Sequence, residues 1–79
     1  MSEVDFFPYH NRHIIFKLND GTELSGVLFD SMTGDTNYTF VATKNMIAWK
    51  KAERDADARK KLESQIDIEN IVWAERLNY

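Results

Sequence analysis

The amino-acid sequence predicts a small, mainly β protein with a helical insertion between its third and fourth strands. Short segments rich in β-branched and aromatic residues, such as HIIFKLN and YTFVAT, are separated by polar turns, which is typical of short strands. A glycine interrupts the second such segment, and a later stretch of Ala, Lys, Arg and Glu contains neither glycine nor proline. We therefore expect a five-stranded barrel with a helix at about residues 46–63.

The first two strands are expected to form a hairpin around the sequence NDG. A three-residue loop over residues 19–21 pairs Phe16 with Leu24 on the inner face. The same loop sets Lys17 opposite Glu23 on the outer face, whereas a two-residue loop would set apolar residues opposite polar ones. Three-residue loops of this kind end on a residue in the left-handed region, a role that suits the glycine of the loop.

Gly26 predicts a bend in the second strand. In the three-residue register it faces Ile14 on the buried side, where a glycine weakens a strand unless the strand bends or another backbone approaches closely. Such a bend is how a small sheet curls into a barrel. Leu28 continues the inner face, while Val27 and Phe29 lie on the other side, so we expect this half of the strand to be covered on both faces.

The remaining elements follow from composition. Further strands are expected at residues 38–43, 65–68 and 71–77. Residues 1–8 are expected to form a tail with a frayed start, and residues 9–79 to form one small domain. The single proline excludes a central strand in the tail. One helical turn there would place three aromatic side chains over one end of the core: Phe6, Phe7 and Tyr9.

The insertion spans residues 45–64 and has the composition of a helix. Asn45 is a suitable N-cap, because its short amide side chain can accept a hydrogen bond from the first turn. Asp55 could cap a second time and divide the insertion into two short helices. We expect Trp49 to dock the first half, with Trp73 of the last strand in the core beneath it.

Length and composition limit the classes of protein. The 79-residue chain has no cysteine and a net charge of −3, and a chain this short gains stability from oligomerisation. Its N-terminus lacks a basic region followed by an apolar run, and no segment approaches the roughly 20 apolar residues of a membrane span. We expect a cytoplasmic homo-oligomer without membrane contact, since a chain without cysteine fits a reducing compartment.

Charge is distributed unevenly along the chain. Residues 44–61 hold seven cations and three anions, a net of +4, whereas the rest holds three cations and ten anions, a net of −7. A charged helix usually has a solvated face, but a basic one can also bind phosphate or an acidic surface. The candidate interaction residues of this insertion are Trp49, Lys50, Lys51, Arg54, Arg59, Lys60 and Lys61.

No motif for catalysis or for a cofactor stands out. His10 and His13 are three residues apart, but a zinc site needs about four ligands and the chain has no cysteine. The serines lack a neighbouring base, and the three scattered glycines form no phosphate-binding loop. We therefore expect neither an enzyme nor a metal or cofactor site.

The stretch IIFKLNDGTELSGVLFD, followed by an asparagine before YTF, resembles the first motif of the Sm-like proteins. The resemblance implies an SH3/Sm-like barrel, a short N-terminal helix in FFPYHNRH, and a nucleotide-facing role for Asp30 and Asn37. Turn chemistry alone also explains both residues, and it is the favoured interpretation. The loop between them is longer than in the family, and DIENIVW, with Glu69 and Asn70, stands where the family has a basic pair.

A second resemblance is to small, uncharacterised bacterial proteins in which a helical insertion begins at KNMIAW and the barrel resumes at IDIENIV. It implies no known activity. The leading functional expectation is a non-enzymatic interaction module that associates with itself. The alternative is an Sm-like RNA-binding protein that uses the basic insertion.

Overall fold

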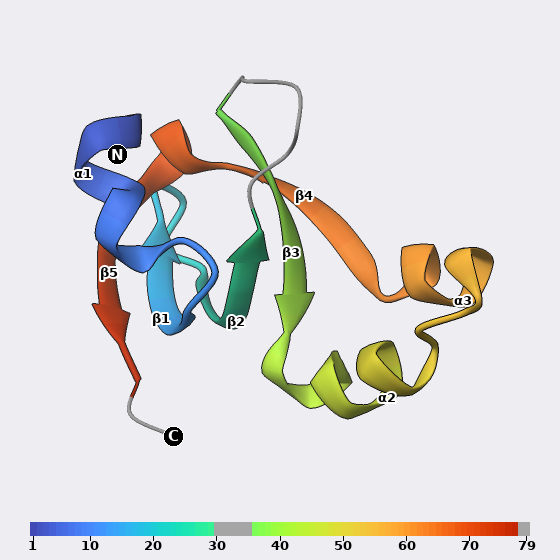
Figure 1. The fold of residues 1–79 in the computed structure, drawn as a ribbon. Helices are drawn as coiled ribbons and strands as arrows, with labels where there is room; N and C mark the ends of the chain where they lie inside the picture. Colours follow the sequence, from blue (N-terminus) through green and yellow to red (C-terminus); the bar gives the residue numbers. More distant parts are fainter. Residues whose placement is uncertain (30–35, 78–79) are drawn as a thin grey trace.

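The computed structural model describes residues 1–29 and 36–77, which form one five-stranded antiparallel sheet with short helices (Figure 1). The order of the strands across the sheet is β4-β3-β2-β1-β5. Their bounds are β1 (His13–Leu18), β2 (Glu23–Phe29), β3 (Asn37–Ala42), β4 (Glu63–Asp67) and β5 (Ile71–Arg76). The mainly β class and the position of the helical insertion between β3 and β4 are therefore confirmed.

The helical elements are all short. They are α1 (Glu3–Phe6), η1 (Phe7–Tyr9), η2 (Thr43–Asn45), α2 (Met46–Lys51), α3 (Ala56–Lys61) and η3 (Ile68–Asn70), where η marks a 3₁₀ helix. No helix among the described residues is long and apolar enough to cross a membrane.

The hairpin of β1 and β2 has the three-residue register expected from the sequence. Phe16 lies opposite Leu24, and Lys17 opposite Glu23. Gly21 has a φ of 90°, and its amide donates to the Leu18 carbonyl oxygen at 2.9 Å. Gly21 thus has a backbone conformation that other residues adopt only with strain.

Gly26 lies opposite Ile14 of β1 and Ala42 of β3. A Cβ at Gly26 would clash with the Val41 carbonyl oxygen and would lie 2.9 Å from the Ala42 Cα. The strand beyond it is covered on both faces, because Val27 and Leu28 are both buried. Gly26 therefore allows β3 to lie closely against the curled sheet.

The expected closure into a barrel is wrong, because β4 and β5 form the two edges of an open sheet. η3 joins these two strands directly, so the edges come together at that end. β4 then follows β3 toward the insertion while β5 follows β1, and the two edge strands diverge (Figure 1). Each edge strand pairs with its inner neighbour on one side only, and its other side stays an edge of the open sheet.

The insertion contains two short helices instead of one helix over residues 46–63. Asp55 separates them and caps α3, since its Oδ1 accepts from the Ala58 amide at 3.1 Å. The division into two helices capped by Asp55 is the alternative that the sequence left open. Asn45 precedes α2, but its side chain makes no capping hydrogen bond, because residues 43–45 already form the 3₁₀ turn η2.

The N-terminal residues, expected to be frayed, form α1 with Ser2 as the capping residue. The amino group of Met1 donates to the carbonyl oxygens of Ile68 and Ile71, both at 2.8 Å. Phe6 is fully buried, whereas Phe7 is 69% exposed, so the aromatic cover of the core rests on Phe6. α1 lies over the core at the end where β4 turns into β5 (Figure 1).

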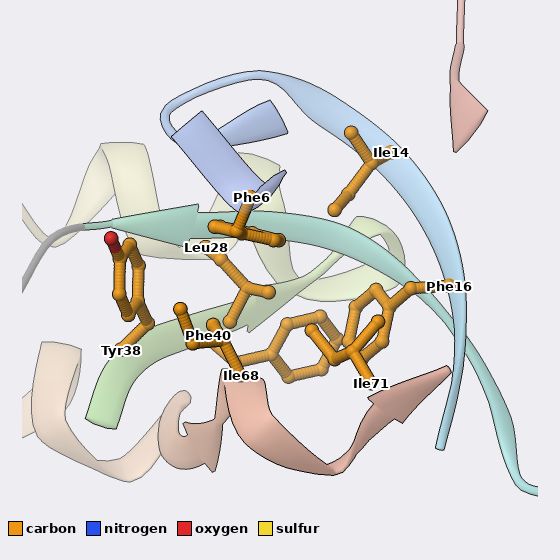
Figure 2. Packing of buried hydrophobic residues seen from close by; sticks show 8 residues of the cluster. All are labelled: Phe6, Ile14, Phe16, Leu28, Tyr38, Phe40, Ile68 and Ile71. Atoms are coloured by element: carbon orange, nitrogen blue, oxygen red, sulfur yellow. The ribbon is translucent and has the colours of Figure 1, made fainter. Parts of the chain in front are cut away.

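One apolar cluster holds the fold together (Figure 2). The Phe16 and Phe40 rings meet edge to face with their centres 5.4 Å apart, and Phe6 meets Tyr38 in the same way at 5.1 Å. Edge-to-face pairs stabilise a core beyond their burial. The cluster consists of Phe6, Ile14, Phe16, Leu28, Tyr38, Phe40, Ile68 and Ile71.

Trp73 lies outside this cluster, so its expected place in the core is wrong. It is 44% exposed and pairs with Lys17, which points to the outer face of β1. Ala74, the next residue, lies opposite the buried Phe16 and occupies the inner face instead. The sheet face to which each β5 residue points is set by the pairing with β1, which the sequence of β5 does not reveal.

Candidate interaction surfaces

Trp49 attaches the insertion to the sheet. Its ring stacks on the Phe29 ring of β2, with centres 5.1 Å apart and planes inclined by 17°. Its indole Nε1 donates to Oε2 of Glu63, the first residue of β4, at 2.8 Å. Trp49 is therefore a partly buried joint between α2 and two strands, with a single polar group that is satisfied by a carboxylate.

Arg59 of α3 completes this joint. Its guanidinium carbon lies 3.9 Å from the centre of the Trp49 ring, and its Nε donates to the Trp49 carbonyl oxygen at 3.2 Å. This geometry is a cation–π contact reinforced by a hydrogen bond. Arg59 therefore connects α3 to α2 and is the member of the basic insertion with a structural role.

The other five cations of the insertion point to solvent: Lys50, Lys51, Arg54, Lys60 and Lys61. The lysines lie in the last turns of α2 and α3, where positive charge complements the carbonyl end of a helix. Lys60 and Lys61 end α3, and one residue separates them from the start of β4 at Glu63, so two cations lie close in the chain to the start of that edge strand. The insertion thus presents a basic surface next to an open sheet edge.

The opposite edge, β5, is more apolar. Val72 is 60% exposed and Trp73 is 44% exposed, side by side on one strand. β5 pairs with β1 along one side only, and its other side is an edge of the sheet. An exposed edge with large apolar side chains is a surface on which further strands can pair.

The two residues that the Sm-like resemblance implies as nucleotide-facing are not brought into a described site. Asn37 is exposed and opens β3 opposite Asp67. Asp30 lies outside the described residues. A nucleotide pocket at this position therefore stays a prediction.

The two histidines form contacts with different parts of the chain. His10 Nδ1 donates to the Phe7 carbonyl oxygen at 2.5 Å, and the two rings lie 4.7 Å apart. His13 Nε2 lies 2.7 Å from Oγ1 of Thr43, the first residue of η2. Within residues 1–29 and 36–77, no group of three or more His, Cys, Asp or Glu side chains is placed to hold a metal ion.

Sequence reasoning missed a polar cleft beside the start of β1. Its volume is about 670 Å³, and Arg12 and Arg76 both line it. These arginines are 64 positions apart in the chain, and they meet because β5 pairs with β1. The only signal in the sequence was the scarcity of cations outside the insertion, which left each arginine as an isolated charge.

Comparison with known proteins adds no relative: the chain matches no family model, no curated protein and no solved structure.

Proposed function

We propose that this protein is a non-enzymatic interaction module that associates with copies of itself through the two edges of its sheet. The observation that carries the proposal is the strand order, which leaves β4 and β5 as edges of one molecule. Because the two edges differ, pairing β4 of one copy with β5 of the next is head to tail and yields a ring or a filament. The five-stranded arrangement is compatible with a small β fold.

Charge supports an antiparallel pairing of these edges. All neighbouring strands within the sheet are antiparallel, and the same arrangement between copies puts the start of β4 beside the end of β5. A register that sets Lys61 opposite Glu75 of a second copy brings the basic end of α3 beside that carboxylate. Opposite charges at this place favour the antiparallel arrangement.

Burial supports the proposal as well. Self-association would cover Val72 and Trp73, which a monomer leaves in water. Apolar surface removed from water contributes roughly 25 cal/mol per Å². A chain of 79 residues buries a small share of its surface alone, so it gains more from a second copy than a large domain would.

The experiment is a mass measurement in solution by sedimentation, over a range of protein and salt concentrations. Reversing Lys60→Glu and Lys61→Glu should raise the dissociation constant about tenfold or more, because like charges then face each other across the edge. The matched control is Lys50→Glu with Lys51→Glu, which makes the same change of net charge on α2, outside the segment that leads into β4. It should change the dissociation constant by less than about threefold.

A monomer at every concentration would refute self-association, and equal weakening by both double variants would refute the edge register. The single change Trp73→Lys provides a second check, since a charge on the apolar edge opposes further pairing. Melting curves of all variants show whether the monomer is still folded.

The alternative function, RNA binding by the insertion, is favoured by the five solvent-facing cations on α2, α3 and their linker. It predicts RNA retention that falls steeply with salt. Here the Lys60→Glu, Lys61→Glu variant would lose RNA while its mass without RNA stayed unchanged. Filter binding with single-stranded and duplex RNA, beside the sedimentation series, separates the two functions.

A further inference from the structure

The polar cleft missed by the sequence analysis lies between residues 9–13, which lead into β1, and the C-terminal end of β5. Tyr9, Asn11, Arg12, Glu75 and Arg76 are among the residues that line it. A smaller depression of about 420 Å³ adjoins it and shares Asn11, Arg12 and Arg76. The two arginines therefore border both hollows. The 670 Å³ of the larger cleft alone suits a small-molecule ligand.

Positive charge is concentrated here against the trend of the chain. Outside residues 44–61 the protein has only three cations, Arg12, Lys17 and Arg76, among ten anions. Two of the three line this cleft. Two guanidinium groups brought together repel each other, so an anion between them is favourable. Among the described residues, neither guanidinium has a hydrogen bond or an ion pair of its own.

The strand register explains why both arginines border the same hollow. Arg76 lies opposite the buried Ile14, so it ends the inward-facing row of β5. Arg12 precedes Ile14 by two residues, just before β1 begins at His13. The pairing of the two segments continues to this end, since the Leu77 amide donates to the His13 carbonyl oxygen at 2.9 Å. Both long side chains therefore start from the same end of the β1–β5 pair and line the same cleft.

Glu75, the one carboxylate among the described residues that line the cleft, occupies a different face. Glu75 pairs with Ile15, which puts it in the outward-facing row of β5, whereas its neighbour Arg76 is in the inward-facing row. Glu75 and Arg76 therefore leave β5 on opposite faces, and both arginines are exposed where they line the cleft. Asn11, held at a φ of 58° with its amide bonded to the Leu28 carbonyl oxygen, adds a neutral amide side chain between them.

We propose that this cleft binds a phosphate-bearing small molecule, with Arg12 and Arg76 gripping the phosphate group. Guanidinium groups donate paired hydrogen bonds in a fixed fork that matches phosphate oxygens. The Tyr9 ring on the cleft wall offers an apolar surface to the organic part of the ligand. A nucleic acid fits less well, because two exposed arginines form no extended basic stripe and the surrounding body is acidic.

The test is a titration of the ¹⁵N-labelled full chain, followed by NMR. One arm uses inorganic phosphate and the other ribose 5-phosphate, with ribose as the uncharged control. Saturable shifts are expected at the amides of Asn11, Arg12 and Leu77. The sugar phosphate should bind more tightly than phosphate alone, because the organic part adds contacts with the wall. Tighter binding of inorganic phosphate would instead identify the free ion as the ligand and overturn the small-molecule assignment.

The double variant Arg12→Gln, Arg76→Gln should weaken binding about tenfold or more, since it removes both charge-assisted contacts. Lys50→Gln with Lys51→Gln removes the same charge elsewhere and should change the affinity less than about twofold. No saturable shift up to roughly 10 mM ligand, or equal weakening in both variants, would overturn the proposal. The proposal does not rest on self-association, because Lys60 and Lys61 stay in place and the mass of each sample is measured separately.

Discussion

The guanidinium group of Arg59 lies over the ring of Trp49, with 3.9 Å between the guanidinium carbon and the ring centre. Trp49 in turn stacks on Phe29 and donates to Glu63, so this contact links α3, α2 and two strands. The two helices have six residues each, too few to be stable alone in water. Their order therefore depends on this joint.

Arg59→Ala tests the joint. The variant removes the cation–π contact and the hydrogen bond to the Trp49 carbonyl oxygen, so the free energy of unfolding should fall by about 1–2 kcal/mol. The indole N–H signal of Trp49 should also move in the NMR spectrum, because the ring loses its cover. Arg54→Ala is the control at an exposed cation and should cost less than about 0.5 kcal/mol. Equal effects of the two changes would contradict a structural role for Arg59.

Gly21→Val tests the turn between β1 and β2. A β-branched residue resists the φ of 90° found here, so the substitution should lower the free energy of unfolding by about 1–2 kcal/mol. A Cβ at this position would have no atom within 4 Å, so the cost is conformational and not a clash. Gly21→Asn should cost less, because asparagine tolerates positive φ. Denaturant titration measures both, and a valine variant as stable as the asparagine variant would refute the strain.

Gly26→Ala tests the close approach of β3. The added methyl group would clash with the backbone at Val41 and approach the Phe40 ring to 2.8 Å. Because backbone atoms of a sheet yield little, the free energy of unfolding should fall by about 1–3 kcal/mol. The matched change Gly21→Ala adds the same methyl group in open space. Thermal melts in which Gly26→Ala left the midpoint unchanged would show that the sheet can yield.

Asp20 predicts a dependence of stability on pH. The Thr22 amide donates to Asp20 Oδ1 at 2.9 Å, and the hydrogen bonds with Thr22 lower the pKa of this carboxyl below its usual 3.8. A lowered pKa means that the charged form is favoured by folding, so its contribution is present above pH 3.8 and is lost as the pH falls through the folded value. The melting point of the wild type should exceed that of Asp20→Asn near pH 6. The difference should shrink below pH 3.8, and a constant difference would contradict this origin.

Local patterns in the sequence were sufficient for the hairpin and for the class of the fold. The loop at Gly21 and the register of Lys17 with Glu23 depend on neighbours within about a dozen positions, where turn chemistry and alternation decide the outcome. Asp55 was recognisable as a capping residue for the same reason. The spacing and type of neighbouring residues are therefore enough to predict these features.

Features that depend on distant segments were decided by the tertiary structure. Trp73 was expected in the core, but the pairing of β5 with β1 turns it outward and puts Ala74 inside. The same pairing brings Arg76 to the cleft that Arg12 lines. β4 and β5 remain the two edges of an open sheet, where a closed barrel was expected. Composition cannot specify these outcomes, because a shift of one residue in a long-range register reverses the face of every side chain in the strand.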